Sequence, residues 1–252
     1  MTQKIKLVVA DIDECITPFW QNHIDLVSME KLQEYCLKLH NVANLPKVVL
    51  NSGRQVPYAE MVVQMLGIFS DYPSILESGS MLYYPNTRKV IVNPNISEEI
   101  IDIFRKIGPR IQTLIDIGAN REVGKELCVS LNPPFGINIE DFFQEVCSIL
   151  SPFIGYISIT YSKTAVDITP EGMNKGSSVD ILEKETPFNR EEMLAIGDSE
   201  SDLSIMSLVG FTACPSNANE NVKKLISEKG GYISPFPETK GVVDIFEKLI
   251  LK

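Results

Sequence analysis

Two carboxylates, Asp11 and Asp13, follow directly after the short apolar run 6–10 near the start of the chain. A spacing of two residues puts both side chains on one side of an extended chain. Carboxylates this close repel each other, and a hard divalent cation such as Mg²⁺ relieves the repulsion. The pair therefore predicts an acidic, cation-binding site where a strand ends. The alternative is a pair of solvated loop residues.

A second pair of acids, Asp198 and Asp202, lies in the segment GDSESD after the apolar run 193–196. Four residues apart at the start of a predicted helix, the two side chains share one face. They are candidates for further ligands of the same cation. The alternative is a local role, in which they cap the helix and complement its dipole.

Ser52 and Gly53 follow the apolar run 47–50, and Lys175 stands where another helix is predicted to begin. A serine hydroxyl and backbone N–H groups at a strand-to-helix turn can bind a phosphate group, although Ser-Gly is also an ordinary turn sequence. A lysine at a helix start opposes the helix dipole, and a neighbouring anion would compensate for this. The residues together predict an anion site, whereas Lys175 alone would be an ordinary surface lysine.

Short β-branched runs alternate with amphipathic stretches, and these elements must position the residues above. Continuous apolar strands separated by helices indicate a parallel sheet covered on both faces. Right-handed crossovers then give a doubly wound α/β layer, with its ligand crevice at the carboxyl ends of the strands. We expect strands at 6–10, 47–50, 74–76, 193–196, 211–213 and 232–233. We expect helices near 28–40, 55–66, 176–185, 200–208, 217–228 and 239–251.

The middle of the chain has a different pattern, with a Pro-Asn turn inside a hairpin and then a helix that has Ser97 as its N-cap. The hairpin, a strand, a second helix and a strand pair are expected at 81–93, near 126–131, near 139–150 and near 155–168. We therefore predict an α/β core at 1–83 and 170–252, with a small α+β cap domain inserted at 84–169. The alternative is one continuous large sheet.

Composition excludes several classes of protein. The chain has 23 Lys and Arg against 33 Asp and Glu, a formal net charge of −10, which argues against a nucleic-acid partner. No apolar run approaches the ~18 residues that span a bilayer, and the stretch 7–10 is too short for a signal peptide. The five cysteines form no CxxC pair and there are two histidines, which argues against a zinc site or a Ser-His-Asp hydrolase. We expect a cytoplasmic protein with reduced thiols and no membrane partner.

In this order the segments resemble the haloacid dehalogenase (HAD) superfamily of phosphohydrolases. VVADIDECIT resembles the family's first motif, a strand ending in DxDGT, and LNSGR resembles its second. Lys175 and GDSESD resemble the third and the fourth. The stretches ILESGS, SNANENVKK and GYISPFPETKGVVDIFEK, with the place of the insertion, resemble the Cof-type or IIB branch, whose type 2 caps occur in phosphoglycolate and sucrose-phosphate phosphatases.

The resemblance implies that Asp11 is the nucleophile, which forms an aspartyl-phosphate, and that Asp13 is the general acid and base. It also implies a Mg²⁺ ion held by Asp11, by Asp13 through its backbone carbonyl and by Asp198, with Asp202 either as a further ligand or as a residue that orients the ligands.

Further roles follow from the same resemblance. Ser52, Gly53 and Lys175 would bind the transferring phosphoryl group. Arg54 and Asn217 would bind substrate, although Asn217 is equally a candidate helix N-cap. Basic residues of the cap region that could reach a substrate are Arg88, Arg121, Lys125 and Lys163.

The chain departs from the family pattern at three positions. Glu14 and Cys15 stand where the family has Gly-Thr, and Ser201 stands where Asn is common. Glu14 adds a negative charge and replaces a residue that is free to adopt positive φ. Acidic neighbours are expected to raise the pKa of the Cys15 thiol, which predicts an inert cysteine.

The activity implied is that of a Mg²⁺-dependent phosphatase acting on a small phosphorylated metabolite of the phosphoglycolate, sugar-phosphate or phosphoglycerate type. Two alternatives stay open: a phosphomutase of the same capped architecture, and a non-catalytic phosphate-binding protein with this fold. The sequence indicates no particular oligomeric state.

Overall fold

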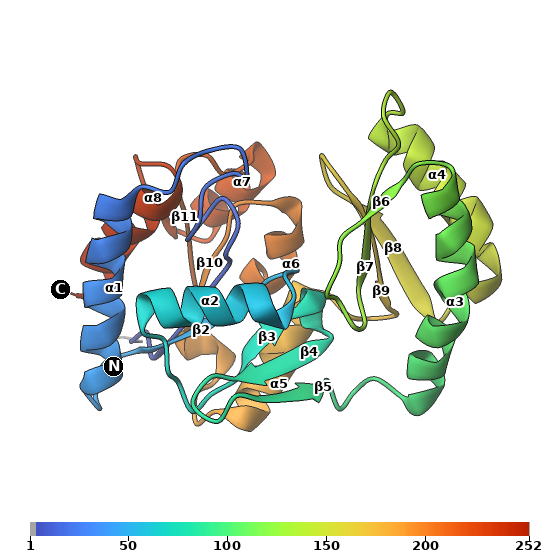
Figure 1. Ribbon diagram of the computed structural model, residues 1–252. Coiled ribbons are helices and arrows are strands. Elements are labelled where there is room, and N and C mark those ends of the chain that lie inside the picture. Colours follow the sequence, from blue (N-terminus) through green and yellow to red (C-terminus); the bar gives the residue numbers. More distant parts are fainter. Residues whose placement is uncertain (1–3, 252) are drawn as a thin grey trace. The chain divides into compact units, whose positions relative to one another are not determined.

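The computed structural model describes residues 4–251 and divides the chain into two compact units (Figure 1). Unit 1 contains the described residues up to Ile91 and again from Asn174 onward, and unit 2 is the segment Val92–Met173. One uninterrupted segment is therefore inserted into a unit that the parts before and after it build together.

A parallel sheet of five strands forms the framework of unit 1, in the order β12-β11-β10-β1-β2. An isolated bridge between Asn51 and Ile75 places β3 beside the end of β2, and β3, β4 and β5 form a small second sheet. The strands of the main sheet are β1 (Leu7–Ala10), β2 (Lys47–Leu50), β10 (Met193–Ile196), β11 (Phe211–Cys214) and β12 (Tyr232–Ile233). Those of the small sheet are β3 (Ser74–Leu76), β4 (Met81–Tyr84) and β5 (Lys89–Val92).

Helices cover both faces of the main sheet, because successive side chains of a buried strand point to opposite sides. Leu7 and Val9 of β1 belong to a core cluster with residues of α5, α6 and α7. Val8 and Ala10 are equally buried and point to the other face, where α1 contacts β2 and packs against α2 and α8. The helices of unit 1 are α1 (Leu26–Asn41), α2 (Val56–Leu66), α5 (Ser178–Glu185), α6 (Leu203–Met206), α7 (Glu220–Glu228) and α8 (Glu238–Ile245).

Unit 2 is a four-stranded antiparallel sheet, in the order β6-β7-β9-β8, packed with two helices. Leu131 and Ile168 of its two central strands are fully buried, as is Phe142 of α4, which contacts β8 and β9. The elements are α3 (Glu98–Asp116), β6 (Asn120–Arg121), β7 (Val129–Asn132), α4 (Ile139–Leu150), β8 (Ile157–Tyr161) and β9 (Val166–Pro170).

The doubly wound α/β class is confirmed, and each of the six expected strands lies within one residue of its predicted position. The strand expected at 74–76 pairs with β4 in the small sheet, however, and is not a strand of the main sheet. Ser97 caps α3 as predicted. The boundaries of the inserted segment differ from the expected 84 and 169, because β4 pairs with β3 and so keeps the β4–β5 hairpin with unit 1. The helix expected at 200–208 is shorter, since its first turn is a 3₁₀ turn at Glu200–Asp202.

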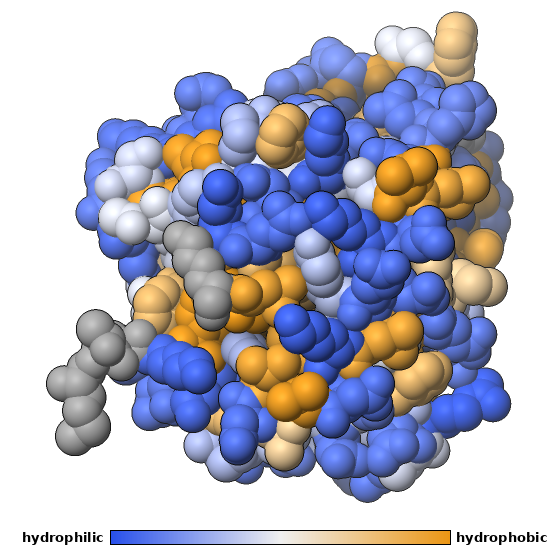
Figure 2. Space-filling model, turned by 90° about the vertical axis from the view of Figure 1, so that its left-hand side faces the viewer, coloured by the Kyte–Doolittle hydropathy of each residue, from blue (hydrophilic) through white to orange (hydrophobic). Residues whose placement is uncertain are grey.

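Between residues 4 and 251, no helix is both long enough and apolar enough to cross a membrane. The face on the side of α1 and α8 is mostly hydrophilic, with apolar side chains in separate small areas (Figure 2). Exposed apolar residues such as Leu26 and Val27 at the start of α1 are ordinary features of protein surfaces.

The two units should lose structure separately when their cores are damaged. We expect Phe142→Ala to lower the free energy of unfolding of unit 2 by about 3–5 kcal/mol, because truncation of a buried phenylalanine leaves a cavity. Limited proteolysis with mass spectrometry should then find the first cuts within 92–173. The matched control is Leu182→Ala in the core of unit 1, whose first cuts should fall outside that segment. Identical cleavage patterns in the two variants would contradict separate cores.

Candidate active site

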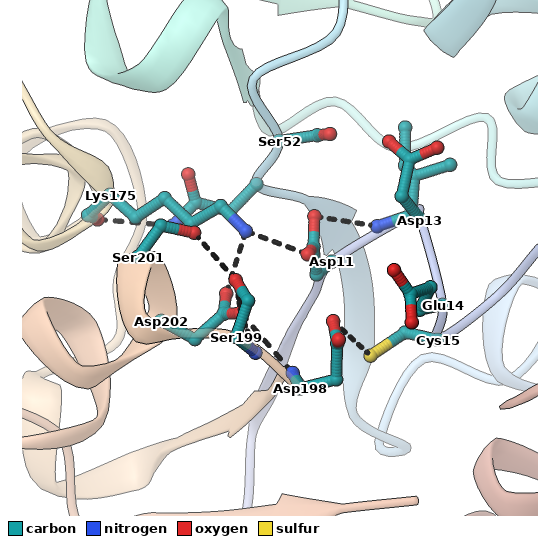
Figure 3. Close-up of polar contacts among 12 residues, drawn as sticks. Asp11, Asp13, Glu14, Cys15, Ser52, Lys175, Asp198, Ser199, Ser201 and Asp202 are labelled. Atoms are coloured by element: carbon teal, nitrogen blue, oxygen red, sulfur yellow. Dashed lines mark hydrogen bonds and ion pairs between the residues drawn. The ribbon is translucent and has the colours of Figure 1, made fainter. Parts of the chain in front are cut away.

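Three carboxylates from distant parts of unit 1 meet at the carboxyl end of the main sheet. Asp11 follows β1, Asp198 follows β10, and Asp202 ends the 3₁₀ turn after it. One oxygen atom from each lies within 4.8 Å of the others, and all three residues are buried. Of the four acids predicted from the sequence, the structure thus brings three together, whereas the side chain of Asp13 lies apart (Figure 3).

Sheet register explains this meeting. β1 and β10 are neighbouring parallel strands, with Ala10 beside Ile196, so the residues that follow them emerge at one edge. A Cβ atom on Gly197 would lie 2.2 Å from Cγ of Asp202, so a side chain there would displace that carboxylate. The Asp202 carboxylate also accepts the N–H groups of Asp198 at 3.2 Å and Ser199 at 3.0 Å. The Asp202 carboxylate therefore stabilises the turn at 198–202 and also faces the cluster.

Lys175 is the cation at the centre of this acidic cluster. Its Nζ atom lies 2.7 Å from the Asp11 carboxylate and 2.7 Å from that of Asp202, and its side chain is only 5% exposed. It begins a 3₁₀ turn that is capped by the side chain of Asn174, which accepts the N–H groups of Gly176 and Ser177. The two carboxylates supply the anion that a lysine at a helix start needs.

The charges in the cluster do not balance. Burial is the main cause that raises the pKa of Asp11 to about 7, against the lowering effect of Lys175. Burial, and then the neighbouring carboxylates, raise the pKa of Asp198 to about 8. The same carboxylates raise the pKa of Lys175 above its usual value although burial opposes this. Three buried carboxylates against one ammonium group leave an excess of negative charge, and the carboxylate oxygens form a ligand set that fits a hard divalent cation.

Ser52 and Gly53 lie beside this cluster, where β2 ends next to β1. Ser52 is buried, its N–H donates to the carbonyl of Ile75 at 3.0 Å, and its Oγ accepts the N–H of Arg54 at 3.3 Å. A Cβ atom on Gly53 would come within 3.3 Å of Oγ of Ser78, so the loop packs closely against that turn. Figure 3 shows the Ser52 hydroxyl near Asp11.

Asp13 has a different environment from the other three acids. The Arg54 guanidinium binds both of its carboxylate oxygens, with Nε at 2.8 Å and Nη2 at 2.7 Å. Arg54 also stacks over the ring of Tyr58, 4.7 Å from its centroid. The predicted substrate ligand and the predicted acid–base residue thus contact each other. The side chain of Asp13 is outside the carboxylate cluster, which leaves its backbone carbonyl as the predicted cation ligand.

The structure shows the surroundings of Glu14, Cys15 and Ser201, the three residues that depart from the pattern of the resembling family. Glu14 has a φ of 53°, so it occupies the left-handed conformation that glycine adopts without strain. The Cys15 thiol donates to Asp198 at 3.7 Å, and its pKa is raised strongly. Burial contributes more to that shift than the acidic neighbours from which we predicted it. Ser201 contacts Ser199 through the hydroxyl groups, at 2.9 Å.

Asn217 uses both ends of its amide within the protein. Its Nδ2 donates to the carbonyl of Glu14 at 2.8 Å, and its Oδ1 accepts the N–H of Glu238 at 2.8 Å. The helix N-cap of α7 is Asn219 instead, so the capping alternative for Asn217 was wrong. Its role in binding substrate stays a prediction.

Two residues next to the cluster received no role in the sequence analysis. Asn51 and Ser178 are both buried, and both bond to the backbone carbonyl of Lys175. A polar residue at the end of an otherwise apolar strand was the only available signal for Asn51. Ser178 has no comparable signal, because serine near a helix start is common.

Known proteins resemble the chain over different lengths. A family model for haloacid dehalogenase-like hydrolases matches residues 136–246. A phosphoglycolate phosphatase of Methanospirillum hungatei is 23% identical over 243 residues, which cover 94% of each chain. A phosphoglycolate phosphatase of Methanobrevibacter smithii is 29% identical over 225 residues, which cover 81% of this chain and 94% of its own.

Solved structures with the same fold cover nearly the whole chain. A haloacid dehalogenase-like hydrolase from Bacteroides thetaiotaomicron has a TM-score of 0.71 at 19% identity, over 98% of this chain and 100% of its own. The sucrose-phosphatase of Synechocystis has a TM-score of 0.69 at 16% identity, over 99% of this chain and 100% of its own. These structures show that the chain has the fold of the haloacid dehalogenase-like hydrolases, and its residues 136–246 match the model of that family.

Proposed function

We propose that the protein hydrolyses a small phosphorylated metabolite in a Mg²⁺-dependent reaction that passes through an aspartyl-phosphate on Asp11. The observation that carries this proposal is the buried cluster of Asp11, Asp198 and Asp202 around Lys175. A phosphate dianion cannot approach a carboxylate nucleophile unless positive charge offsets their repulsion. The cluster supplies one such charge in Lys175 and the ligands for another.

The cation would be held by the carboxylates of Asp11, Asp198 and Asp202 together with the backbone carbonyl of Asp13. A divalent cation bound there would neutralise charge on the phosphoryl oxygens. Every donor in this set is an oxygen, which is the ligand type that Mg²⁺ takes.

Asp11 would act as the nucleophile. Its Oδ1 accepts the N–H of Ile12 at 2.8 Å and its Oδ2 contacts Lys175, so the carboxylate orientation is fixed. In the proposed first step a carboxylate oxygen of Asp11 bonds to phosphorus as the bond to the leaving oxygen breaks. The ammonium of Lys175 and the hydroxyl of Ser52 would bind the phosphoryl oxygens as charge shifts onto them.

Asp13 would give a proton to the leaving oxygen and then take a proton from the water that hydrolyses the aspartyl-phosphate. Both of its oxygens contact Arg54 in the structure. One of these contacts must therefore open before Asp13 can reach the reacting oxygens. A substrate anion that binds Arg54 would open it, which joins the predicted substrate role of Arg54 to the acid–base role of Asp13.

Unit 2 is proposed to select the substrate. Its polar cluster centres on Lys125, whose side chain is 5% exposed and contacts Glu122 at 2.7 Å and Ser130 at 2.6 Å. Ser130 in turn donates to Asp167 on the neighbouring strand. The relatives named phosphoglycolate phosphatase and the fold of sucrose-phosphatase support a small acid phosphate or a sugar phosphate as substrate.

Phosphate release from a panel of small phosphorylated metabolites tests the proposal directly. We expect release in the presence of Mg²⁺, its loss in EDTA, and a fall of at least about a thousandfold in Asp11→Asn, which removes the nucleophile. Full activity of Asp11→Asn would overturn the mechanism. Isomerised sugar phosphate without released phosphate would indicate the mutase instead. Phosphate binding without turnover of any compound would indicate a non-catalytic protein.

Lys175→Met tests the charge balance of the cluster without any substrate. Removal of the ammonium leaves Asp11 and Asp202 buried without their cationic partner, so we expect a loss of about 3–5 kcal/mol in EDTA. Added Mg²⁺ should restore part of it, because a ligand that binds only the native state stabilises that state. Urea unfolding with and without Mg²⁺ measures both effects. A variant as stable as the unaltered protein in EDTA would contradict the proposed site.

Lys125→Met tests the substrate role of unit 2. We expect the order of preference among phosphorylated acids and phosphorylated sugars to change by about tenfold or more, since a buried charge contributes strongly to discrimination. The ratio of kcat/KM values for one compound of each class measures this. Lys106→Met is the matched control, because Lys106 is an exposed lysine of the same unit and is not among the residues expected to reach a substrate. An unchanged ratio in Lys125→Met, with lower stability, would assign Lys125 a structural role only.

A further inference from the structure

The side chain of Asn51 joins the end of β2 to the backbone that carries Lys175. Its Nδ2 donates to the carbonyl of Lys175 at 3.0 Å and to Oγ of Ser178 at 3.0 Å. A backbone carbonyl can only accept, so the atom that faces it must be the amide nitrogen. Asn51 and Lys175 are 124 residues apart in the chain. This contact is therefore a direct tie between two distant segments of the site.

Asn51 is itself held firmly. Its backbone N–H donates to the carbonyl of Ala10 at 2.9 Å, and a bridge joins it to Ile75 on the other side. Asn51 as a whole is only 2% exposed. The donor that meets Lys175 is therefore held between β1, which Asp11 follows, and β3.

The amide oxygen of Asn51 has no hydrogen-bond partner within the described part of the chain. A buried polar atom without a partner costs free energy that an apolar residue of similar size would avoid. An asparagine is thus a poor choice here for packing alone. Its two N–H donors are the feature that an apolar residue lacks.

Ser178 completes the contact. Its hydroxyl accepts from Asn51 and donates to the same carbonyl of Lys175. Two donors therefore converge on one backbone oxygen. On the other side of the turn, the N–H of Gly176 donates to Oγ of Ser204 at 2.9 Å. The backbone of Lys175 is held from both sides, and its long side chain starts from a fixed point.

We propose that Asn51 is a positioning residue, which acts through the Lys175 carbonyl to set where the Lys175 ammonium meets Asp11 and the phosphoryl group. The inference rests on the proposed function and adds a residue to which neither the sequence motifs nor the relatives assign a role. The alternative is that Asn51 only stabilises the fold.

Phosphate affinity distinguishes the two roles, with inorganic phosphate as the probe and Mg²⁺ present. We expect Asn51→Leu, which keeps the branching at Cγ but has no donors, to weaken phosphate binding by about tenfold, the effect of losing one or two hydrogen bonds. Ser178→Ala should weaken it in the same direction but less, because Asn51 still contacts the carbonyl. It also serves as the second variant if Asn51→Leu does not fold.

Ser74→Ala is the matched control. Ser74 is buried, and its Oγ accepts the N–H of Leu50, the residue before Asn51, at 3.1 Å. This substitution removes a hydrogen bond from the same strand without touching the Lys175 turn. It should lower the midpoint of urea unfolding and leave phosphate affinity within about twofold of the unaltered protein.

A double-mutant cycle with Lys175→Met shows whether Asn51 acts through Lys175. We expect Asn51→Leu to have little further effect on phosphate affinity in the Lys175→Met background, because coupled residues are not additive. Equal losses in both backgrounds, or normal phosphate affinity in Asn51→Leu, would overturn the inference while the proposed function stands. No phosphate binding by the unaltered protein would overturn the proposed function, and this inference with it.

Discussion

The burial of three carboxylates around one ammonium group is the constraint on which the rest of the site depends. Asp11, Asp198 and Asp202 would repel one another in a dry environment, and Lys175 offsets only part of that repulsion. Such a cluster persists only where its backbone is fixed by other interactions. The parallel sheet provides this, because β1 and β10 deliver two of the acids at one edge in register. Removing any one charge changes the balance of the other three.

Strained backbone gathers in the loops that surround this cluster. Glu14, Glu77 and Ser78 all have a positive φ angle, which residues other than glycine rarely adopt. The turn at Glu77 and Ser78 donates its two N–H groups to the carbonyls of Arg54 and Ser52, so it holds the proposed phosphate loop from behind. Residues in such conformations persist when the surrounding structure determines them, and they cluster at functional sites.

The sequence was sufficient for the parts of the site that follow strand ends. Apolar runs with acids behind them predicted where Asp11 and Asp198 lie, since parallel strands end at one edge. The sequence did not predict the hydrogen bond from Asn51 to Lys175 or the ion pair of Arg54 with Asp13. Contacts between a side chain and a distant segment leave no periodic pattern in a sequence. The boundary of unit 2 was misplaced for the same reason, because the pairing of β4 with β3 decided it.

The geometry of Lys175 also explains why its position must be controlled closely. An ammonium group has three N–H donors, and two of them meet Asp11 and Asp202 at 2.7 Å each. The third can reach a phosphoryl oxygen only if the ammonium keeps one orientation between the two carboxylates. A flexible four-carbon side chain would not hold that orientation if its backbone moved. Under the proposed function, a fixed contact to the backbone of Lys175 would therefore control the charge that meets the phosphoryl group.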